Sequence, residues 1–442
     1  MGLNSTWDDS TQANPNVPPL DRSWSYGSMP IRGVNVGGWL SIEPFITPSL
    51  FQTFNSSANV VDEWTLTSTL GPDQAKETIE QHYSSFVNAQ TFSDIRAAGF
   101  DHVRIPFSYW AVTTYEGDPY VPKVSWRYLL RGIEYCRWNG LRVNLDLHGV
   151  PGSQNGWNHS GRQGVIGWLN GTDGDLNAQR TIDIHNQLST FFAQPRYKNI
   201  IQLYGLVNEP RMIVLDTTKV INWTANAIST VRGNNITCTI VFSDGFLGLD
   251  NWQGKFQGLD NLLLDAHQYV IFNDGQIAMS HSDKLNFACA GWSAQMQSSE
   301  NTATGFGPTL CGEWSQADTD CTLYLNGVGT GARWDGTMAG NGGPQCPTKN
   351  NPICECNDAN ASPDRYSATY KQWLLDFAEA QMQSFEIGWG WFYWTWDTES
   401  STQWSYKNGL AAGILPTNIA KRQFNCNDSI PDFSAMGLPE NY

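Results

Sequence analysis

The chain has 442 residues, of which 13% are aromatic and 15% are charged. This length and aromatic content allow a large buried core, in one big domain or in two to three ordinary ones. Acidic residues outnumber basic residues 42 to 26, which gives a net charge of -16. This charge argues against nucleic acid or a membrane surface as a partner. It suits a soluble protein that acts on a neutral substrate.

The cysteines and the glycosylation sequons indicate an oxidising compartment. Seven of the nine cysteines lie at or beyond residue 289. Glycosylation sequons begin at Asn4, Asn55, Asn158, Asn170, Asn222, Asn235, Asn360 and Asn427. This density is typical of secreted glycoproteins. We therefore expect a secreted protein, extracellular or in the cell wall, with several disulfides and at least one free cysteine. No apolar run is long enough to span a bilayer, and no secretory signal peptide is present, so we expect the numbering to begin at or near a mature end.

Strand-like and helix-like segments alternate along the chain. Residues 1–28 are rich in Pro and Asn and are expected to form an unstructured or surface-lying lead-in. Eight apolar runs are predicted as strands, at residues 31–39, 100–107, 141–149, 203–207, 239–246, 261–269, 308–313 and 388–396. Helices are predicted at residues 74–98, 126–138, 181–192, 216–231 and 365–383.

Strand-helix alternation repeated eight times is typical of a (β/α)8 barrel. We therefore predict an α/β fold in which residues 29–442 form a single catalytic barrel domain, a monomer with elaborated loops at the carboxyl-terminal rim. A Cys-rich insertion is expected near residues 324–364. In such barrels the functional side chains lie at this rim, where the strands end.

Two predicted strands end in a glutamate. Glu209 follows the fourth strand within Asn208-Glu209-Pro210, and Glu313 follows the seventh. A glutamate is most often a solvated charge or a structural ion-pair partner, but its position directly after an apolar strand favours a chemical role. Two carboxyls among aromatic residues are typical of glycoside hydrolysis. We predict Glu313 as the nucleophile, Glu209 as the acid/base and Asn208 as the ligand of the sugar 2-hydroxyl.

Five further rim residues are candidate substrate-binding or supporting groups. Arg104 is predicted to keep the nucleophile ionised and Tyr269 to orient it. The simpler alternatives are that Arg104 belongs to a structural ion pair and that His148 and His267 are buried core histidines. Trp394 is predicted to form a platform for a sugar ring, although some aromatic residues of its run must belong to the barrel core.

Several other chemistries lack their sequence motifs. No paired-His spacing accompanies the acids, and neither a Gly-rich phosphate loop, a dinucleotide fingerprint nor a Gly-X-Ser-X-Gly motif is present. Cys354-Glu355-Cys356 is too closely spaced and too poor in neighbouring His to indicate zinc. We therefore predict an enzyme that needs no metal and no cofactor.

Six motifs together resemble those of a known family. They are Arg32 to Trp39, Glu43 to Phe51, Asp146-Leu147-His148-Gly149, Pro151 to Gly156, Asn208-Glu209-Pro210 and Gly312-Glu313-Trp314-Ser315. They are similar to motifs of the fungal exo-β-1,3-glucanases of glycoside hydrolase family five, and the similarity runs from about residue 24 to residue 426.

The resemblance implies a retaining enzyme that removes glucose from the non-reducing ends of β-1,3-glucan. It further implies that Glu43 binds the terminal glucose and that Trp157 and Phe272 form an aromatic clamp at the entrance. It also implies disulfides between Cys321 and Cys346 and between Cys289 and Cys426, with structural roles for Asp318 and Asp320.

Two departures from the family pattern leave the substrate open. Trp157-Asn158-His159 stands where the glucanases have Phe-Asp-Asn, so Asn158 replaces an acid expected to contact the terminal sugar. The Cys-rich insertion is also longer than in the family. The enzymatic alternative is a rutinosidase-like diglycosidase or a broad β-glucosidase acting on small glycosides. A non-catalytic glucan-binding barrel is a further alternative, but it has no need for both Glu209 and Glu313.

Overall fold

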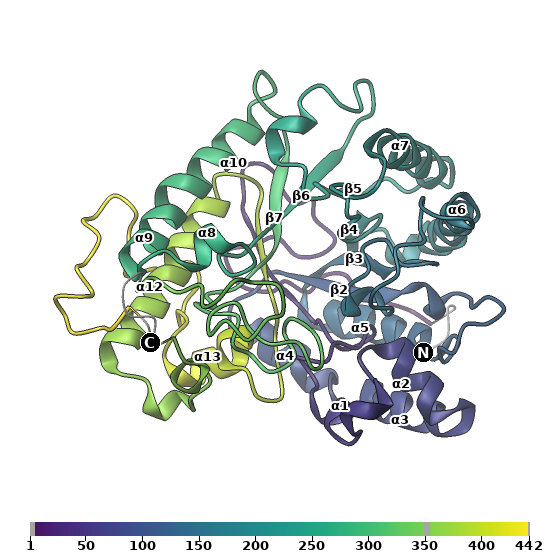
Figure 1. Cartoon of the computed structure of the whole chain (residues 1–442). Helices are drawn as coiled ribbons and strands as arrows, with labels where there is room; N and C mark the ends of the chain where they lie inside the picture. The colour runs from purple at the N-terminus through teal and green to yellow at the C-terminus, as the bar shows by residue number, and fades with distance from the viewer. Residues whose placement is uncertain (1–4, 349–353, 441–442) are drawn as a thin grey trace.

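Eight parallel strands pair in the order β1 to β8 and close into a barrel in the computed structural model, which describes residues 5–348 and 354–440 (Figure 1). The strands are β1 (Ile31–Asn35), β2 (His102–Ser108), β3 (Arg142–Gly149), β4 (Ile201–Gly205), β5 (Thr239–Ser243), β6 (Leu262–Gln268), β7 (Thr309–Trp314) and β8 (Gly390–Tyr393). The predicted (β/α)8 barrel is thereby confirmed.

Some strands are shorter than the sequence pattern predicts, because their last apolar residues leave the sheet and form the rim. β1 ends at Asn35, and Gly38 turns the chain with a left-handed φ of 68°. β8 ends at Tyr393, although the backbone N–H groups of Trp394 and Trp396 still donate to the carbonyls of Trp314 and Asn35 at the ends of β7 and β1. Beyond these strand ends, Trp394 stacks on His148 at the mouth, whereas Trp39 and Trp396 pack into the core.

The helices cover the outside of the strands (Figure 1). The larger ones are α2 (Glu63–Leu70), α3 (Pro72–Ser85), α4 (Ala89–Ala97), α5 (Val124–Asn139), α6 (Gly174–Phe192), α7 (Thr217–Gly233), α10 (Ser293–Glu300), α12 (Ala368–Phe385) and α13 (Tyr406–Ala412). The shorter ones are α1 (Ser49–Gln52), α8 (Asp274–Ile277), α9 (His281–Asn286) and α11 (Cys356–Ala359).

The single helix predicted at residues 74–98 is wrong, because the structure has two helices there, α3 and α4. Asn88 separates them, since its side chain accepts hydrogen bonds from the backbone N–H groups of Gln90 and Thr91 and caps α4. The sequence also predicted no helix between β6 and β7, where α8, α9, a π-helical turn (Phe287–Trp292) and α10 follow one another. These short helices bury few side chains, so their apolar spacing is weak.

The base of the barrel is closed by apolar side chains. Ile31, Leu203, Val241, Leu263, Leu310 and Phe392 form a separate buried cluster inside the strands, with Tyr26 and Trp389 packed against it. The described part of the lead-in runs along this end, and the guanidinium of Arg142 donates hydrogen bonds to the backbone carbonyls of Pro18, Pro19 and Arg22. The predicted functional residues lie at the opposite end, where the strands finish.

Three disulfides are present in the described residues: Cys289–Cys426, Cys321–Cys356 and Cys346–Cys354. The first confirms the pairing that the family resemblance implied. The implied pairing of Cys321 with Cys346 is wrong, because Cys346 pairs within the insertion while Cys321, just after β7, reaches Cys356 at the start of α11. Asp318 and Asp320 have the structural roles expected of them, in an ion pair with Lys284 and in hydrogen bonds to the backbone of the insertion.

Some of the predictions concern residues that the structure does not describe. The sequon at Asn4, residues 1–4 of the lead-in and residues 349–353 of the insertion lie outside the described residues. Within the described ranges, no helix has both the length and the apolar character that crossing a membrane requires.

Candidate active site

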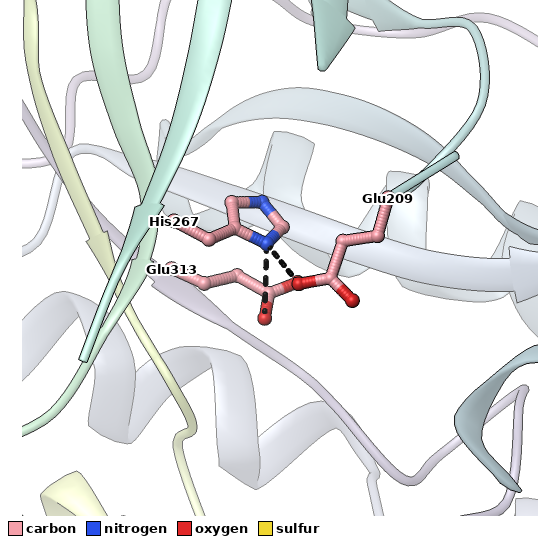
Figure 2. A group of neighbouring side chains, drawn as sticks. All are labelled: Glu209, His267 and Glu313. Carbon is pink, nitrogen blue, oxygen red and sulfur yellow. Dashed lines mark hydrogen bonds and ion pairs between the residues drawn. The ribbon is translucent and has the colours of Figure 1, made fainter. Parts of the chain in front are cut away.

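Glu209 and Glu313 converge on one point at the carboxyl-terminal mouth. Figure 2 shows both side chains directed at the ring of His267, which lies on β6, while Glu313 lies on β7 and Glu209 follows β4. His267 Nδ1 lies 2.6 Å from Glu209 Oε1 and 3.5 Å from Glu313 Oε2. One oxygen of each glutamate and one ring nitrogen of His267 all lie within 4.8 Å of one another. The two carboxyls can therefore reach a single sugar unit.

Glu313 is held by two of the predicted rim residues. Arg104 Nη1 on β2 donates a hydrogen bond of 2.6 Å to Glu313 Oε1. The Tyr269 hydroxyl donates one of 3.1 Å to the other oxygen. Gly312 leaves room for the neighbouring carboxylate of Asp265, which a Cβ at this position would meet. These contacts fix the position of the Glu313 side chain, which is 7% exposed.

Glu209 has a different setting. Its backbone adopts a left-handed φ of 47°, which is uncommon for a residue with a side chain and is a conformation often found at functional sites. Its carbonyl accepts a hydrogen bond of 3.3 Å from Asn155 Nδ2. His267 contacts one side-chain oxygen, and His159 Nε2 lies 3.3 Å from the other. The carboxyl therefore sits between two imidazole rings.

The charges of this group are coupled. Burial raises the pKa of Glu209, but the hydrogen bond and charge of His267 outweigh burial and lower the pKa to about 2. Burial, together with the charge of Glu209, raises the pKa of Glu313 against the opposing charges of His267 and Arg104. Burial lowers the pKa of His267, but the charges of Glu313 and Asp265 outweigh it and raise that pKa well above its ordinary value. His267 thus shifts the pKa of both glutamates, and both glutamates shift the pKa of His267.

Arg104 is the centre of a buried hydrogen-bond network behind the two glutamates. Besides Glu313, it contacts Asn35 Oδ1 at 3.0 Å, Asn208 Oδ1 at 2.8 Å and Asp146 Oδ2 at 3.1 Å. Asn208 is thereby oriented beside Glu209, as the sequence prediction requires. Asn35 and Asp146 were not among the predicted site residues, although both lie inside the family-like motifs.

Glu43, His148 and Trp394 form one wall of the mouth. The Trp394 ring lies parallel to the His148 ring, with centroids 5.5 Å apart. His148 Nδ1 contacts Asp146 at 2.7 Å, and its Nε2 lies 3.9 Å from Glu43 Oε1. That Glu43 oxygen has no hydrogen-bond partner among the described residues. Burial, with the charges of Glu313 and Glu209, raises the Glu43 pKa well above its ordinary value. This wall offers polar atoms that a sugar hydroxyl can satisfy.

The predicted aromatic clamp is arranged as two separate groups. The Trp157 ring meets Phe246 edge-on at 5.3 Å, and the Arg211 guanidinium lies 5.3 Å from the Trp157 centroid. Phe272 is 41% exposed and meets Tyr269 edge-on at 5.4 Å. Phe246 was not among the predicted site residues, although it ends the strand predicted at residues 239–246; in the structure β5 ends at Ser243, and Phe246 lies in the loop that follows. A clamp between Trp157 and Phe272 stays a prediction.

Asn158 is the predicted site residue that the structure connects least to the carboxylates. It opens a short 3-10 turn (Asn158–Ser160) and is half-buried. Its neighbour His159 is the residue of this turn that contacts Glu209. From the changed Trp157-Asn158-His159 segment we predicted a binding role for Asn158 and none for His159. A contact of Asn158 with substrate stays a prediction.

Glu209, His267 and Glu313 are also the one group in the described residues with three side-chain ligand atoms close enough to hold a metal ion. Arg104, 2.6 Å from Glu313, already places a positive charge beside this group. A second cation there meets electrostatic repulsion, whereas a neutral sugar does not. The donor set therefore suits a carbohydrate better than a metal.

The fold and the converging carboxyls define the class of a glycoside hydrolase, and comparison with known proteins gives the family. Residues 66–329 match the family model described as Cellulase (glycosyl hydrolase family 5). This chain belongs to glycosyl hydrolase family 5. The predicted family membership is confirmed.

Relatives with similar sequences carry a more specific name. The chain is 57% identical over 444 residues to the probable glucan 1,3-beta-glucosidase D of Aspergillus niger and 58% identical over 445 residues to the protein of that name from Aspergillus terreus. Each match covers 100% of this chain and 53% of the relative, so the chain spans about half the length of these curated relatives. A crystal structure of rutinosidase from Aspergillus niger has a TM-score of 0.68 at 17% identity, covering 89% of this chain and 99% of that chain, which shows a shared fold.

Proposed function

We propose that this chain is a retaining β-glucosidase that releases glucose from the non-reducing ends of β-1,3-glucan. The observation that carries the proposal is the convergence of Glu209 and Glu313 within 4.8 Å at one mouth of the barrel. Retaining glycosidases keep their two carboxyls about 5 to 5.5 Å apart, whereas inverting enzymes need room for a water molecule between carboxyl and sugar. The names of the relatives support the glucan substrate.

Each glutamate has its own step in the proposed reaction. Glu313, held by Arg104 and Tyr269, attacks the anomeric carbon while Glu209 protonates the leaving oxygen. The glycosyl bond to the leaving group breaks and a glycosyl-enzyme ester forms. Glu209 then takes a proton from water, which attacks the ester and releases glucose with its original configuration. Glu209 enters the first step protonated, and the proton that it takes from water in the second step restores that form for the next turnover.

The remaining site residues support binding in this proposal. Glu43 and His148 bind hydroxyls of the terminal glucose, Asn208 binds the 2-hydroxyl, and Trp394 stacks on the sugar ring. Further binding contacts are assigned to Trp157, Asn158, His267 and Phe272. The enzyme needs no cofactor and acts as a secreted monomer, and the three disulfides support an oxidising compartment.

The proposal is tested by incubating the protein with laminarin, a β-1,6-glucan and rutin in parallel. We expect glucose as the sole product from laminarin, and proton NMR should show it first as the β-anomer. A disaccharide released from rutin, without glucose from laminarin, would assign the chain as a diglycosidase instead. Oligosaccharides as early products from laminarin would contradict exo-cleavage, and α-glucose as the first anomer would contradict retention.

A further inference from the structure

His159 lies against the predicted acid/base on the side opposite His267. Its Nε2 is 3.3 Å from Glu209 Oε2, while His267 Nδ1 is 2.6 Å from Oε1 of the same carboxyl. The two rings come from distant parts of the chain, the loop after β3 and strand β6. Each oxygen of Glu209 therefore has its own imidazole neighbour.

The His159 ring is held in place by its neighbours. It lies between the rings of Trp157, at 5.5 Å, and His148, at 5.3 Å. The next residue, Ser160, fixes the short turn by donating a hydrogen bond of 2.8 Å to the Trp157 carbonyl. The His159 side chain is 19% exposed. Its position is therefore set by the fold of the loop and does not depend on the contact with Glu209.

The chemistry of His159 suits a neutral hydrogen-bond donor. Burial lowers its pKa to about 4, although the charge of Glu209 opposes this effect, so the ring is neutral near neutral pH. His159 Nδ1 is buried and has no hydrogen-bond partner in the described ranges of the chain. A neutral ring carries one N–H, and Nε2 is the ring nitrogen that faces an acceptor.

We infer that His159 is a positioning residue for the acid/base: it holds the Glu209 carboxyl from the side opposite His267 and so aims its proton at the leaving oxygen. This inference rests on the proposed function. A carboxyl in contact with one ring only is free to rotate about its terminal torsion, which is broad for glutamate. A second contact on the other oxygen restricts that rotation before substrate binds.

The same contact sets the strength of the acid. An N–H that faces a carboxylate stabilises its ionised form and lowers its pKa. Loss of His159 therefore raises the pKa of Glu209, which makes it a weaker acid that keeps its proton to higher pH. The titratable groups that interact with Glu209 or His159 from the surrounding elements are Glu43, Asp146, His148, Asp244, His267, Tyr269 and Glu313. Arg104 contacts Glu313, and Arg211 lies over the ring of Trp157.

The test uses three substitutions of His159. His159→Gln places an amide N–H near the position of Nε2, His159→Asn places one near Nδ1, and His159→Phe keeps a ring without a donor. Each is assayed on phenyl β-glucoside, whose leaving group needs a proton, and on 2,4-dinitrophenyl β-glucoside, whose leaving group does not. For the Phe and Asn variants we expect kcat/KM, which reports the step that forms the glycosyl-enzyme, to fall about tenfold on the first substrate and to stay near the wild-type value on the second. The Gln variant should recover most of the loss.

The pH profile gives a readout that a purely structural role leaves unchanged. The alkaline limb of kcat/KM reports the acid that must be protonated, so it should move to higher pH in His159→Phe and stay near the wild-type position in His159→Gln. Equal losses on both glucosides, or an alkaline limb that stays in place in the Phe variant, overturn the inference. Wild-type protein that hydrolyses neither glucoside nor laminarin instead overturns the proposed function.

Discussion

The two ends of the barrel use the same strands but treat their polar side chains differently. β2 carries His102 at the base and Arg104 at the mouth, and β3 carries Arg142 at the base and His148 at the mouth. At the base, His102 has a partner on both ring nitrogens, Asp101 at 2.6 Å and the Tyr26 hydroxyl at 3.0 Å. That pair of contacts leaves nothing on the His102 ring for a ligand to satisfy.

Among the described residues, buried polar atoms without a hydrogen-bond partner include carboxylate oxygens at the mouth, whereas those near the base are single guanidinium nitrogens of Arg142 and Arg422. In the part of the chain that the structure describes, Glu43 Oε1, Asp265 Oδ1 and His267 Nε2 have no hydrogen-bond partner. Buried polar groups are normally paired because an unpaired group costs about 1 to 3 kcal/mol. The mouth therefore gives up stability to keep atoms available for substrate, while the paired groups at the base contribute stability. Substitutions at the two ends should have opposite effects on activity and stability.

The largest effect is expected when a glutamate at one end of the barrel is replaced by glutamine and compared with the same replacement at the other end. Glu313→Gln should lower kcat on laminarin at least about 10⁴-fold, because an amide cannot act as the nucleophile. Its thermal midpoint should be unchanged or higher, since one charge leaves a crowded acidic group. Activity assays and thermal unfolding measure both quantities.

The matched control is Glu386→Gln at the base, where Glu386 accepts hydrogen bonds from Arg32 at 2.8 Å and from Trp391 at 3.2 Å and also pairs with Arg422. It should keep kcat and lose about 2 kcal/mol of unfolding free energy. If Glu313→Gln retains its rate, or if Glu386→Gln inactivates a folded protein, the proposed division between the two ends is wrong.

The next effect concerns Asp318, which follows the same strand as Glu313 but has its partners on a neighbouring helix instead of at the two glutamates. It contacts Lys284 at 2.6 Å and His281 at 2.9 Å, and its side chain is completely buried. Asp318→Asn should lower the unfolding free energy by about 3 to 5 kcal/mol, because it leaves a buried lysine unpaired. Urea unfolding measures this loss, and adding Lys284→Met should recover part of it. The folded variant should keep the wild-type kcat.

The stabilisation by Asp318 should depend on pH. Burial raises the Asp318 pKa, but the charges of Lys284 and His281 outweigh burial and hold it well below its ordinary value of 3.8. A lowered folded-state pKa gives a stabilisation that is present above the unfolded value and is lost as the pH falls through the folded value. The stability difference between the wild type and Asp318→Asn should therefore shrink on acidification. A difference that grows in acid would contradict this assignment.

The smallest effect tests the pairing at the base. Tyr26→Phe removes the hydroxyl that contacts His102 and should lower the unfolding free energy by about 1 kcal/mol without changing kcat or KM. Denaturant unfolding and glucose release from laminarin measure these quantities. A loss of activity in the folded variant would show that the base and the mouth are coupled.

The sequence alone determined the barrel and the two carboxylates of the site. Strand runs ending in Glu209 and Glu313 can be read locally, because each strand places its last residues at one rim. Parallel strands in a closed barrel then bring these strand ends together at one rim, irrespective of the conformation of the loops. The same logic located Arg104, His148, His267 and Tyr269, while the roles of all these residues remain predictions.

Only the tertiary structure decided which loop residues meet. The contact of His159 with Glu209, the pairing of Trp157 with Phe246 and the disulfide between Cys321 and Cys356 each join segments whose path between strands has no local pattern. Strand ends are fixed by hydrogen bonding between neighbouring strands, but loop positions result from the packing of many side chains at once. For this reason the carboxylates could be predicted from the sequence, and the residue that we propose to aim one of them could not.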